Sequence, residues 1–417
     1  MKIWFTEIGE PLPFEKDVRL HRYGTFTQLL TKLGHEVTWW TSTFSHAKKA
    51  FVFSEDCERD FNGVKIKFIH GPGYRRNISV ARFRHQADFS KKFYELARES
   101  KDKPDLIVSP IPTLEVANLA ARLGVEFNVP VVTDIRDEWP EEFVDLAPKP
   151  IRPFAKLLLN GYFKRIDYIC RNVQGIIGVS ERQLNYGLKY AKRAQNDNDG
   201  VFPQGYSPDP LDAAKIEAAT AWWTAQGVRK SAFVCCFFGT IGKFFNIETV
   251  IKAARILEKD LDIQFVICGD GSSLPQLKKL AADTESVIFP GWVDGPQISS
   301  LMVMSKVGLA PYLRGSRMSL PNKPFEYFAG GLAVVSSIDG ELTRILKDND
   351  CGITYSPDSA DELADALRTL YNSPEKCREM GQRARKLLED EYATQKIAER
   401  MSQHFSRVVH NFGAKNA

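Results

Sequence analysis

Residues 319–336 have the sequence SLPNKPFEYFAGGLAVVS, which contains a loop, a helix and a strand in quick succession. Leu320-Pro321 favours an extended loop, because proline disfavours the helical conformation in the residue before it. We expect a helix to begin about Asn322 and continue over 323–329, and the apolar run 333–336 to form a buried strand. This succession is typical of a parallel sheet with helices on its faces.

The same alternation of apolar strands and amphipathic helices continues outward through both halves of the chain. In the second half, strands are predicted at 233–238, 264–268, 287–289 and 307–310, and helices at 246–259 and 274–282. In the first half, strands are predicted at 2–5, 36–40, 64–69, 105–108, 129–133 and 175–179, and helices at 25–33, 79–100, 114–123 and 152–168. A further helix should follow Ser180 as its N-cap, with Gln183 completing a capping box. Two consecutive doubly wound α/β units are therefore predicted.

The length of 417 residues also favours two domains, because a single hydrophobic core stops growing at about 250–300 residues. Residues 193–210 contain QNDNDG and FPQGYSPDP, which are rich in turn-forming residues. We place the domain boundary near residue 205. The tail 374–412 has a helical period, with an apolar stripe that needs a surface to cover. The stripe consists of Ile397, Met401, Phe405, Val408 and Val409.

Composition excludes several classes of protein. The 56 basic and 52 acidic residues give a net charge of +4, which offers no global support for nucleic-acid binding. Seven cysteines without CxxC spacing indicate reduced thiols. The first residues reach Glu7 before any long apolar run, which is not typical of a signal peptide. The longest apolar run, 232–238, is far below the ~20 residues of a transmembrane helix. We expect a cytoplasmic protein whose membrane contact, if any, is peripheral, on the inner face.

Three glycine-containing loops follow predicted strands of the second half. Gly239 and Gly242 follow 233–238, Gly269 and Gly271 follow 264–268, and the pair Trp292-Val293 comes after the third strand. Carboxyl ends of parallel strands share one edge of a sheet, and glycines let backbone amides approach phosphate oxygens there. A nucleotide site is the functional interpretation. Tight turns are the structural alternative.

Lys323 and Glu326 lie one turn apart at the start of the predicted helix 323–329. An acidic side chain at this position can accept hydrogen bonds from both ribose hydroxyls, and the lysine can face phosphates. The structural alternative is a surface helix with an i,i+3 ion pair. Together with the glycine loops, the pair favours nucleotide binding.

On these residues the chain resembles glycosyltransferase family 4, the retaining GT-B enzymes, and particularly their bacterial polysaccharide-biosynthesis branch. The resemblance extends to LGHEV at 33–37, IGVS at 177–180, FPQG at 202–205 and the segment 265–293. It implies two Rossmann-like domains facing a central cleft. The acceptor-binding domain would comprise 1–205 with 395–417, and the nucleotide-sugar-binding domain 206–394. By this resemblance Glu326 binds the nucleotide ribose.

The chain departs from the family pattern around the phosphates. Met318 stands where the first glutamate of the family's pair is expected, so backbone amides near Ser319 and Leu320 would replace its contact with the sugar. The usual arginine and lysine align nearest Thr240 and Phe245. We expect Lys243 and Lys323 to supply the missing charge, with Arg314 or Arg317 as helpers.

In the first half, RDEWPE at 136–141 follows a strand and resembles an element of the same branch. Asp137 is a candidate contact for the transferred sugar or the acceptor. The alternative is a carboxylate at a helix N-terminus beside a structural Trp139. The acceptor loop of the family corresponds to the stretch after the first strand, and the expected acceptor-binding residues are Glu10, Arg19, His21 and Arg22.

Two basic and aromatic stretches, 74–84 and 152–165, suit an anionic membrane surface. A lipid-linked acceptor is the hypothesis that follows from them. Core-packed helices with solvated lysines are the alternative.

No HxH, HExxH or metal-binding Asp-x-Asp pattern is evident, so we expect neither a metal nor another cofactor. The expected catalytic residues are Asp137, Lys243 and Lys323. The expected donor-binding residues are Gly239, Gly242, Lys243, Gly269, Gly271, Trp292, Val293, Arg317, Ser319, Leu320, Lys323 and Glu326.

The resemblance implies retaining transfer of a hexose-type sugar from a nucleotide sugar to a glycan or lipid-linked glycan in polysaccharide biosynthesis. A UDP-sugar is the first expectation and a GDP-sugar the second. A nicotinamide oxidoreductase is disfavoured because no GxGxxG follows the first strand. A GT-B epimerase or phosphorylase and a sugar-nucleotide-binding regulatory subunit remain open.

Overall fold

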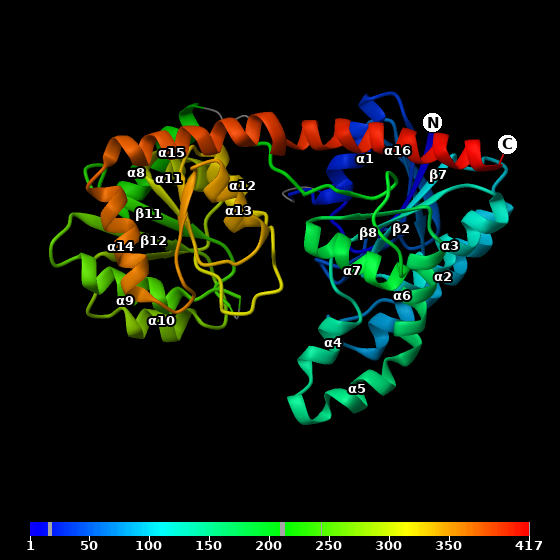
Figure 1. Cartoon of the computed structure of the whole chain (residues 1–417), viewed down its shortest axis with the longest axis horizontal. Coiled ribbons are helices and arrows are strands. Elements are labelled where there is room, and N and C mark those ends of the chain that lie inside the picture. Colours follow the sequence, from blue (N-terminus) through cyan, green and yellow to red (C-terminus); the bar gives the residue numbers. More distant parts are fainter. Residues whose placement is uncertain (16–18, 209–212, 243, 417) are drawn as a thin grey trace. The chain divides into compact units, whose positions relative to one another are not determined.

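The computed structural model describes residues 1–15, 19–208, 213–242 and 244–416 (Figure 1). The chain divides into two compact units. Unit 1 comprises Met1–Gln204 and Gln395–Ala417, and unit 2 comprises Gly205–Thr394. The boundary predicted near residue 205 lies next to this division. Each unit has its own sheet and its own cores.

Unit 1 contains an eight-stranded sheet in the order β10-β9-β8-β7-β1-β2-β6-β5. Its strands are β1 Lys2–Thr6, β2 Glu36–Ser42, β5 Cys57–Phe61, β6 Val64–Ile69, β7 Leu106–Ile111, β8 Val131–Ile135, β9 Gly175–Gly178 and β10 Gly200–Val201. Neighbouring strands are parallel, except that β5 is antiparallel to β6. A small hairpin joins β3 Phe44–Ser45 to β4 Ala50–Phe51.

Helices cover both faces of the unit 1 sheet. They are α1 Arg22–Lys32, α2 Val80–Glu99, α3 Leu114–Phe127, α4 Glu141–Leu146, α5 Arg152–Leu158, α6 Asn160–Asn172, α7 Glu181–Ala191 and α16 Thr394–Asn416. Apolar residues of α2, α3, α6 and α7 form the core on one face, and those of α1 and α16 form the core on the other. The predicted stripe on α16 is buried in this second core at Ile397, Met401, Phe405 and Val408.

Unit 2 contains a six-stranded, wholly parallel sheet in the order β13-β12-β11-β14-β15-β16. Its strands are β11 Phe233–Phe238, β12 Ile263–Cys268, β13 Val287–Gly291, β14 Val307–Ala310, β15 Ala333–Ser336 and β16 Gly352–Thr354. Its helices are α8 Ala213–Ala225, α9 Ile247–Leu257, α10 Leu274–Leu280, α11 Gly295–Met304, α12 Lys323–Ala329, α13 Glu341–Asp348, α14 Ala360–Tyr371 and α15 Pro374–Leu387, the last followed by the π-helical turn Leu388–Tyr392. Consecutive residues of β11 alternate between two cores, so both faces are covered.

Two predictions about helices are wrong in detail. The helix predicted at 152–168 is broken at Leu159, which has ψ of 7° between α5 and α6, just before Asn160-Gly161. Asparagine and glycine are weak helix formers, which permits the break. Ser180 is the N-cap of α7, but its hydroxyl donates to the side chain of Gln183 instead of accepting from the helix backbone.

Candidate functional site

The strand order of unit 2 reverses direction between β11 and β14, which are neighbours in the sheet but far apart in sequence. Doubly wound sheets bind ligands outside the carboxyl ends of the strands at such a switch point. The loops that leave these two strands touch each other through a bridge between Phe245 and Tyr312. The switch point of unit 2 therefore marks its candidate ligand site.

Backbone hydrogen bonds join the glycine loops at this edge of the sheet. The Gly239 amide donates to the Cys268 carbonyl (3.1 Å), and the Gly269 amide donates to the Gly291 carbonyl (2.7 Å). The Ile241 amide donates to the Asp270 carbonyl (2.9 Å). The loops that follow β11, β12 and β13 thus form one connected surface.

Two of these glycines are required by the packing of one loop on the next. Gly269 has φ of +134°, and a Cβ there would lie 1.9 Å from the Gly239 carbonyl oxygen. Gly271 has φ of +157°, and its Cβ would lie 2.1 Å from the Ile241 carbonyl oxygen. The tight-turn interpretation therefore accounts for these two positions by itself, and a ligand role for them rests on their place at the switch point.

Lys323 reaches the end of β11 from the first residue of α12. Its Nζ donates to the carbonyl oxygen of Phe238, the last residue of the strand. The ammonium lies 5.1–5.6 Å from the ring centroids of Phe237, Phe238 and Phe245, within the range of cation–π attraction. A Cβ on Gly239 would lie only 2.4 Å from Nζ. A positive charge is thus fixed at the switch point, and the glycine provides the space for it.

Glu326 lies one turn after Lys323 and is half-buried. Burial is the main cause that raises the pKa of Tyr312, and the negative charge of Glu326 adds to the effect. Because Tyr312 belongs to the bridge between the two loops, this coupling places Glu326 beside the switch point. The predicted pair thus borders the candidate site.

The other predicted donor-binding residues occupy several environments. Trp292 is 75% exposed, whereas Val293 and Leu320 are buried in the core, so any donor contact of these two is limited to their backbone. The Ser319 hydroxyl accepts from the Glu341 amide (3.1 Å) at the start of α13, which gives it a structural task. Gly242 lies in the β11 loop, and its amide donates to the Thr240 carbonyl.

The remaining basic candidates differ from one another. Arg314 forms an ion pair with Asp358 (3.2 Å). Arg317 is half-buried. Lys243, predicted as both a catalytic and a donor-binding residue, lies outside the described residues.

Unit 1 has a corresponding switch point between β1 and β7. Thr6, the last residue of β1, donates a hydrogen bond from its hydroxyl to the hydroxyl of Ser109 within β7 (2.7 Å). Glu7 follows β1 directly, is 5% exposed, and its Oε2 has no hydrogen-bond partner within the described part of the chain. Burial raises the pKa of Glu7 to about 8, against the opposing attraction of Arg136.

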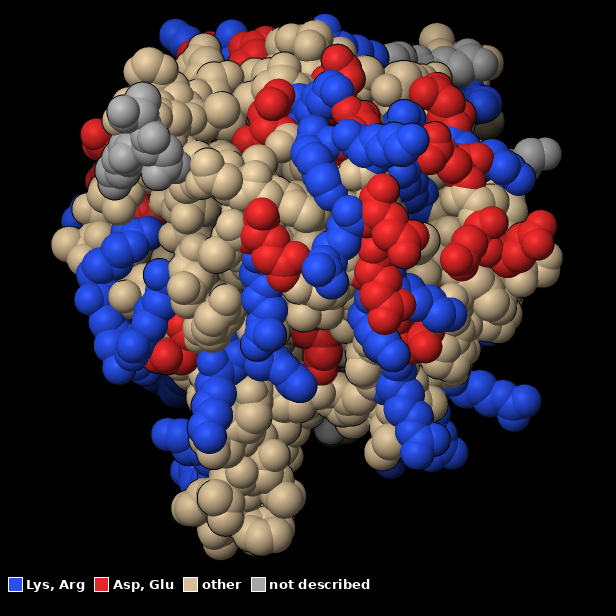
Figure 2. Space-filling model, turned by 90° about the vertical axis from the view of Figure 1, so that its right-hand side faces the viewer, with Lys and Arg blue, Asp and Glu red and all other residues tan. Residues whose placement is uncertain are grey.

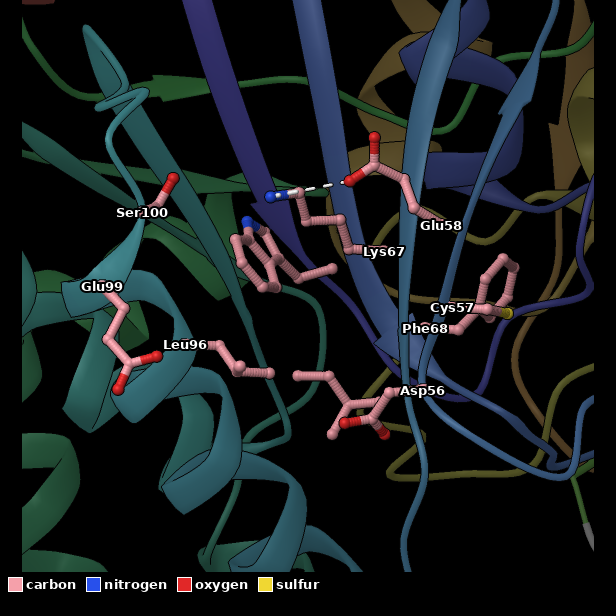
Figure 3. A pocket seen from close by; sticks show the side chains of 10 residues that line it. Asp56, Cys57, Glu58, Lys67, Phe68, Leu96, Glu99 and Ser100 are labelled. Carbon is pink, nitrogen blue, oxygen red and sulfur yellow. Dashed lines mark ion pairs between the residues drawn. The ribbon is translucent and has the colours of Figure 1, made fainter.

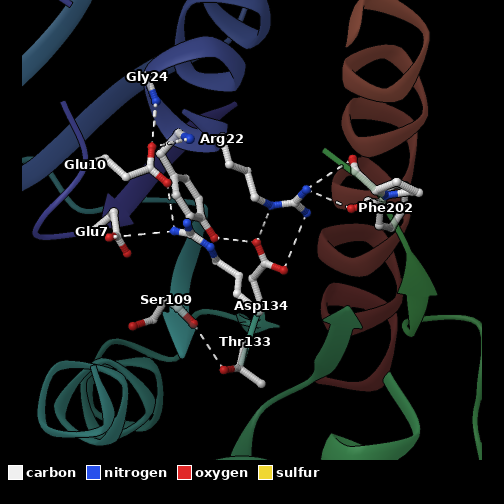
Figure 4. Close-up of polar contacts among 11 residues, drawn as sticks. Glu7, Glu10, Arg22, Gly24, Ser109, Thr133, Asp134 and Phe202 are labelled. Carbon is white, nitrogen blue, oxygen red and sulfur yellow. Dashed lines mark hydrogen bonds and ion pairs between the residues drawn. The ribbon is translucent and has the colours of Figure 1, made fainter. Parts of the chain in front are cut away.

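Arg136 connects Glu7 and Glu10, the two acidic side chains that Figure 4 labels at this edge of the sheet. It follows β8, and its Nη1 lies 2.7 Å from Glu10 Oε1 and 3.7 Å from Glu7 Oε1. Burial also raises the pKa of Asp137, the next residue, while Arg136 and Arg82 oppose that rise. Two carboxyl groups at this edge of the sheet therefore have raised pKa values, and Arg136 opposes the rise in both; perturbed carboxyl groups of this kind are common at functional sites.

Two predicted acceptor-binding residues have partners inside unit 1, and their contact with an acceptor stays a prediction. Glu10 is buried, and its Oε2 accepts from the amides of Tyr23 (2.7 Å) and Gly24 (3.2 Å) at the start of α1. Arg22 is 1% exposed; its Nε pairs with Asp134 Oδ2 at 2.7 Å, and its Nη1 donates to the Phe202 carbonyl at 2.7 Å. Both side chains are occupied inside unit 1 (Figure 4).

The other two acceptor candidates, Arg19 and His21, are exposed and stay predictions. Asp137 precedes Pro140, the N-cap of α4, so it is not in the first turn of that helix. Trp139 has a structural role, since its ring packs on Phe143 with centroids 4.1 Å apart. The alternative of a structural Trp139 thus holds, whereas the alternative that Asp137 is a carboxylate at a helix N-terminus does not.

Sequence reasoning did not identify Glu7 and Arg136 as site residues. A signal was available, because both residues directly follow strands, and the residues that follow strands were the ones selected in unit 2. The same selection at β1 and β8 would have included them. The ion pair between Arg22 and Asp134 left no comparable signal, since its partners are separated by 112 positions.

A separate depression of about 350 Å³ lies in unit 1 beside β5, β6 and the end of α2 (Figure 3). Lys67 lies 3.7 Å from Glu58 there, and its Nζ is 4.6 Å from the Trp40 ring centroid. None of the predicted site residues lines this depression. It is therefore distinct from both switch points.

Among the described residues, no group of three or more His, Cys, Asp or Glu side chains could hold a metal ion. None of the described helices combines the length and the apolar character that crossing a bilayer requires.

Two doubly wound sheets, one with a lysine and a glutamate at its switch point, define a class of nucleotide-binding α/β proteins. Two family profiles match the chain: "Glycosyl transferases group 1" at residues 222–387 and "Glycosyltransferase Family 4" at residues 24–195. The chain belongs to the family 4 glycosyltransferases of the GT-B fold. The sequence prediction of family and fold is thereby confirmed.

Curated relatives are distant. A glycosyltransferase of Methanocaldococcus jannaschii is 24% identical over 59% of this chain and 60% of its own length. Alpha-D-kanosaminyltransferase of Streptomyces kanamyceticus is 25% identical over 64% of this chain and 67% of its own length. Alpha-monoglucosyldiacylglycerol synthase of Streptococcus pneumoniae is 24% identical over 69% and 61%. The matched region thus spans only about three fifths to two thirds of these relatives.

Solved structures share the fold over nearly the whole chain. Sucrose-phosphate synthase of Thermosynechococcus elongatus has a TM-score of 0.70 at 15% identity and covers 98% of this chain and 99% of its own. HepE of Anabaena, solved with UDP, has a TM-score of 0.65 at 14% identity and covers 98% and 100%. HepE has also been solved with UDP-glucose.

Proposed function

We propose that this chain transfers a hexose-type sugar from a nucleotide sugar bound by unit 2 to a glycan or lipid-linked glycan acceptor bound by unit 1. The observation that carries the proposal is the pair Lys323 and Glu326 at the switch point of unit 2, beside the connected glycine loops. A UDP-sugar is the first choice of donor, because HepE binds UDP and UDP-glucose on the same fold. A GDP-sugar is the second.

Unit 2 would stabilise the diphosphate that leaves the sugar. As the bond to the sugar breaks, negative charge develops on the phosphate oxygens, and fixed charges and dipoles stabilise it best. Lys323 supplies a fixed positive charge, and the amides of the β11 loop supply dipoles. Glu326 accepts the ribose hydroxyls. Lys243 adds a second charge in this proposal, and no metal ion is required.

Unit 1 would hold the acceptor. Asp137 is half-buried and directly follows Arg136, so it is the candidate for contact with the transferred sugar or with the acceptor hydroxyl. Arg19 and His21 are exposed candidates for binding the rest of the acceptor. We infer retention of the anomeric configuration and a role in polysaccharide biosynthesis from the resemblance to the retaining family.

Product analysis with labelled UDP-glucose tests this function. A transferase releases UDP and passes the label to an acceptor or slowly to water, and Glu326→Ala should lose this turnover. An altered nucleotide sugar would instead indicate an epimerase, and a sugar phosphate formed with inorganic phosphate would indicate a phosphorylase. Tight binding without turnover across a broad acceptor panel would indicate a regulatory subunit. Each of the last three results would contradict the proposal.

A further inference from the structure

Five large apolar side chains of unit 1 stand exposed at the end of α4, on the following short turn and on α5. Their exposed fractions lie between 53% and 70%, although residues of these types are usually buried. Figure 1 shows α4 and α5 at the far end of unit 1 from α16. We call this surface the apolar tip, and its members are Leu146, Ile151, Phe154, Leu157 and Leu158.

The apolar tip follows from the helical period of α5. Ile151, Phe154 and Leu157 are spaced three residues apart, and Leu158 is four residues after Phe154, so these side chains share one side of the helix. No residue of α4 or α5 is fully buried. The apolar side of α5 therefore faces outward instead of covering the core of unit 1.

Exposed lysines lie along the segment that carries the apolar tip. Residues 146–166 contain three lysines and two arginines and no aspartate or glutamate. Lys149, Lys156 and Lys164 are exposed. Figure 2 shows the lowest part of the molecule, where α5 lies in Figure 1, as an uncharged end with basic side chains above it.

The segment is also held in shape. Arg152 pairs with Asp145 (3.1 Å) and donates to the Ala147 carbonyl (3.2 Å), which ties the start of α5 to the end of α4. Arg165 pairs with Glu115 on α3 (3.6 Å), which anchors the following helix to the core. The apolar side chains are thus presented by a braced structure.

We propose that the apolar tip docks onto the surface of an anionic lipid bilayer. Apolar side chains at the end of a basic segment suit the boundary between headgroups and acyl chains, where lysines meet anionic headgroups. Phe154, Leu157 and Leu158 would enter this boundary, and Lys149, Lys156 and Lys164 would lie among the headgroups. This inference rests on the proposed function and deepens it, because a chain docked on the bilayer would have access to a lipid-linked acceptor.

Vesicle flotation tests the docking without donor or acceptor, so its outcome is independent of the proposed transfer reaction. The full chain is mixed with phosphatidylcholine vesicles that contain or lack phosphatidylglycerol. We expect binding only to the vesicles with phosphatidylglycerol, and the double variant Phe154→Ser, Leu157→Ser should lower the partition coefficient by about tenfold. The triple variant Lys149→Glu, Lys156→Glu, Lys164→Glu should abolish binding.

The matched control is the double variant Val125→Ser, Val303→Ser, because these two valines are 65% and 75% exposed elsewhere. It should bind as the parent does, and all variants should keep the parent's melting temperature because the changed residues are exposed. The proposal is overturned if the parent binds no anionic vesicles, or if the Phe154, Leu157 variant binds them as well as the parent. Self-association through the apolar tip without vesicle binding would overturn it too.

Discussion

Lys323 is the residue on which the proposed chemistry depends most. Its Nζ is fixed by the Phe238 carbonyl and by three aromatic rings, so Lys323→Met keeps the apolar length and removes only the charge. Loss of a fixed charge that stabilises a leaving group costs about 10²–10³ in rate. We expect kcat for sugar release from UDP-glucose to fall by this factor in a steady-state assay.

The control for this prediction is Lys347→Met, which changes an exposed lysine of the same unit. Its kcat should equal that of the parent. If Lys323→Met also retains the parent's kcat, the ammonium at the switch point has no catalytic role.

Glu7 should make the folded chain less stable as pH rises, whereas a carboxylate in an ordinary ion pair makes it more stable. The pKa of Glu7 rises from 4.5 to about 8 on folding, so the folded chain binds a proton that the unfolded chain releases between these values. The free energy of unfolding should therefore fall as pH rises through this window, by at most about 1.4 kcal/mol per pH unit from this group. Urea unfolding of the parent and of Glu7→Gln between about pH 5 and about pH 8 measures the difference.

Glu7→Gln cannot ionise, so its stability should fall less steeply with pH than that of the parent. Glu55→Gln, a change at an exposed acid of unit 1, should leave the slope unchanged. Parallel slopes for the parent and Glu7→Gln would show that Glu7 is ionised in the folded chain.

For single residues, the sequence could predict which side chains lie beside the end of a strand. It could not predict which partners those side chains bind. Lys323 and Glu326 were predicted as site residues because they begin a helix beside strand ends. Glu10 and Arg22 look equally suitable in the sequence, yet one accepts from the start of α1 and the other pairs with Asp134. Only the fold brings such partners together across the chain.

Among the elements, the glycine loops give the sharpest prediction. Gly269→Ala adds a Cβ beside the Gly239 carbonyl at a φ that disfavours alanine, so it should destabilise unit 2 by ~2 kcal/mol or more and weaken UDP binding. Gly295→Ala is the control, because a Cβ there meets nothing within 4 Å. Equal melting temperatures for the two variants would contradict the packing described for these loops.

The helix α16 should be essential to unit 1. Phe405 is fully buried in its core, with its ring centroid 6.5 Å from that of Phe5 on β1. Phe405→Ala should lower the free energy of unfolding by about 3–5 kcal/mol, measured by urea unfolding. Arg407→Ala, an exposed change on the same helix, should cost less than about 0.5 kcal/mol. A small effect of Phe405→Ala would mean that α16 does not complete this core.

Elements with a strong apolar signal could be predicted from the sequence. The bounds predicted for β6, β11, β14, α12 and β15 agree with the structure. The edge strand β5 was missed because its sequence CERDF is polar and three of its residues are exposed. Helices α8, α11, α13 and α14 were also missed. The break between α5 and α6 was hidden by a helical period that continues across Leu159, and it is this break that separates α5 from the buried part of α6.

For the whole molecule, the sequence predicted two doubly wound units and a C-terminal helix that belongs to the first. The structure has this division, and unit 2 has the strand order of a Rossmann sheet, with its switch point between β11 and β14. The identity of the base, the sugar and the acceptor could not be predicted from a sequence pattern, because it depends on a few contacts within loops. The family match supports the reaction class, and ligand measurements must supply the rest.

Calorimetric titration of the full chain with UDP tests the central claim that unit 2 binds a nucleotide. We predict a single binding site for UDP, weaker binding of GDP, and a loss of affinity of about tenfold or more in Glu326→Ala, which corresponds to about 1.4 kcal/mol. Absence of binding by both nucleotides, or equal affinity of the parent and Glu326→Ala for UDP, would contradict the claim.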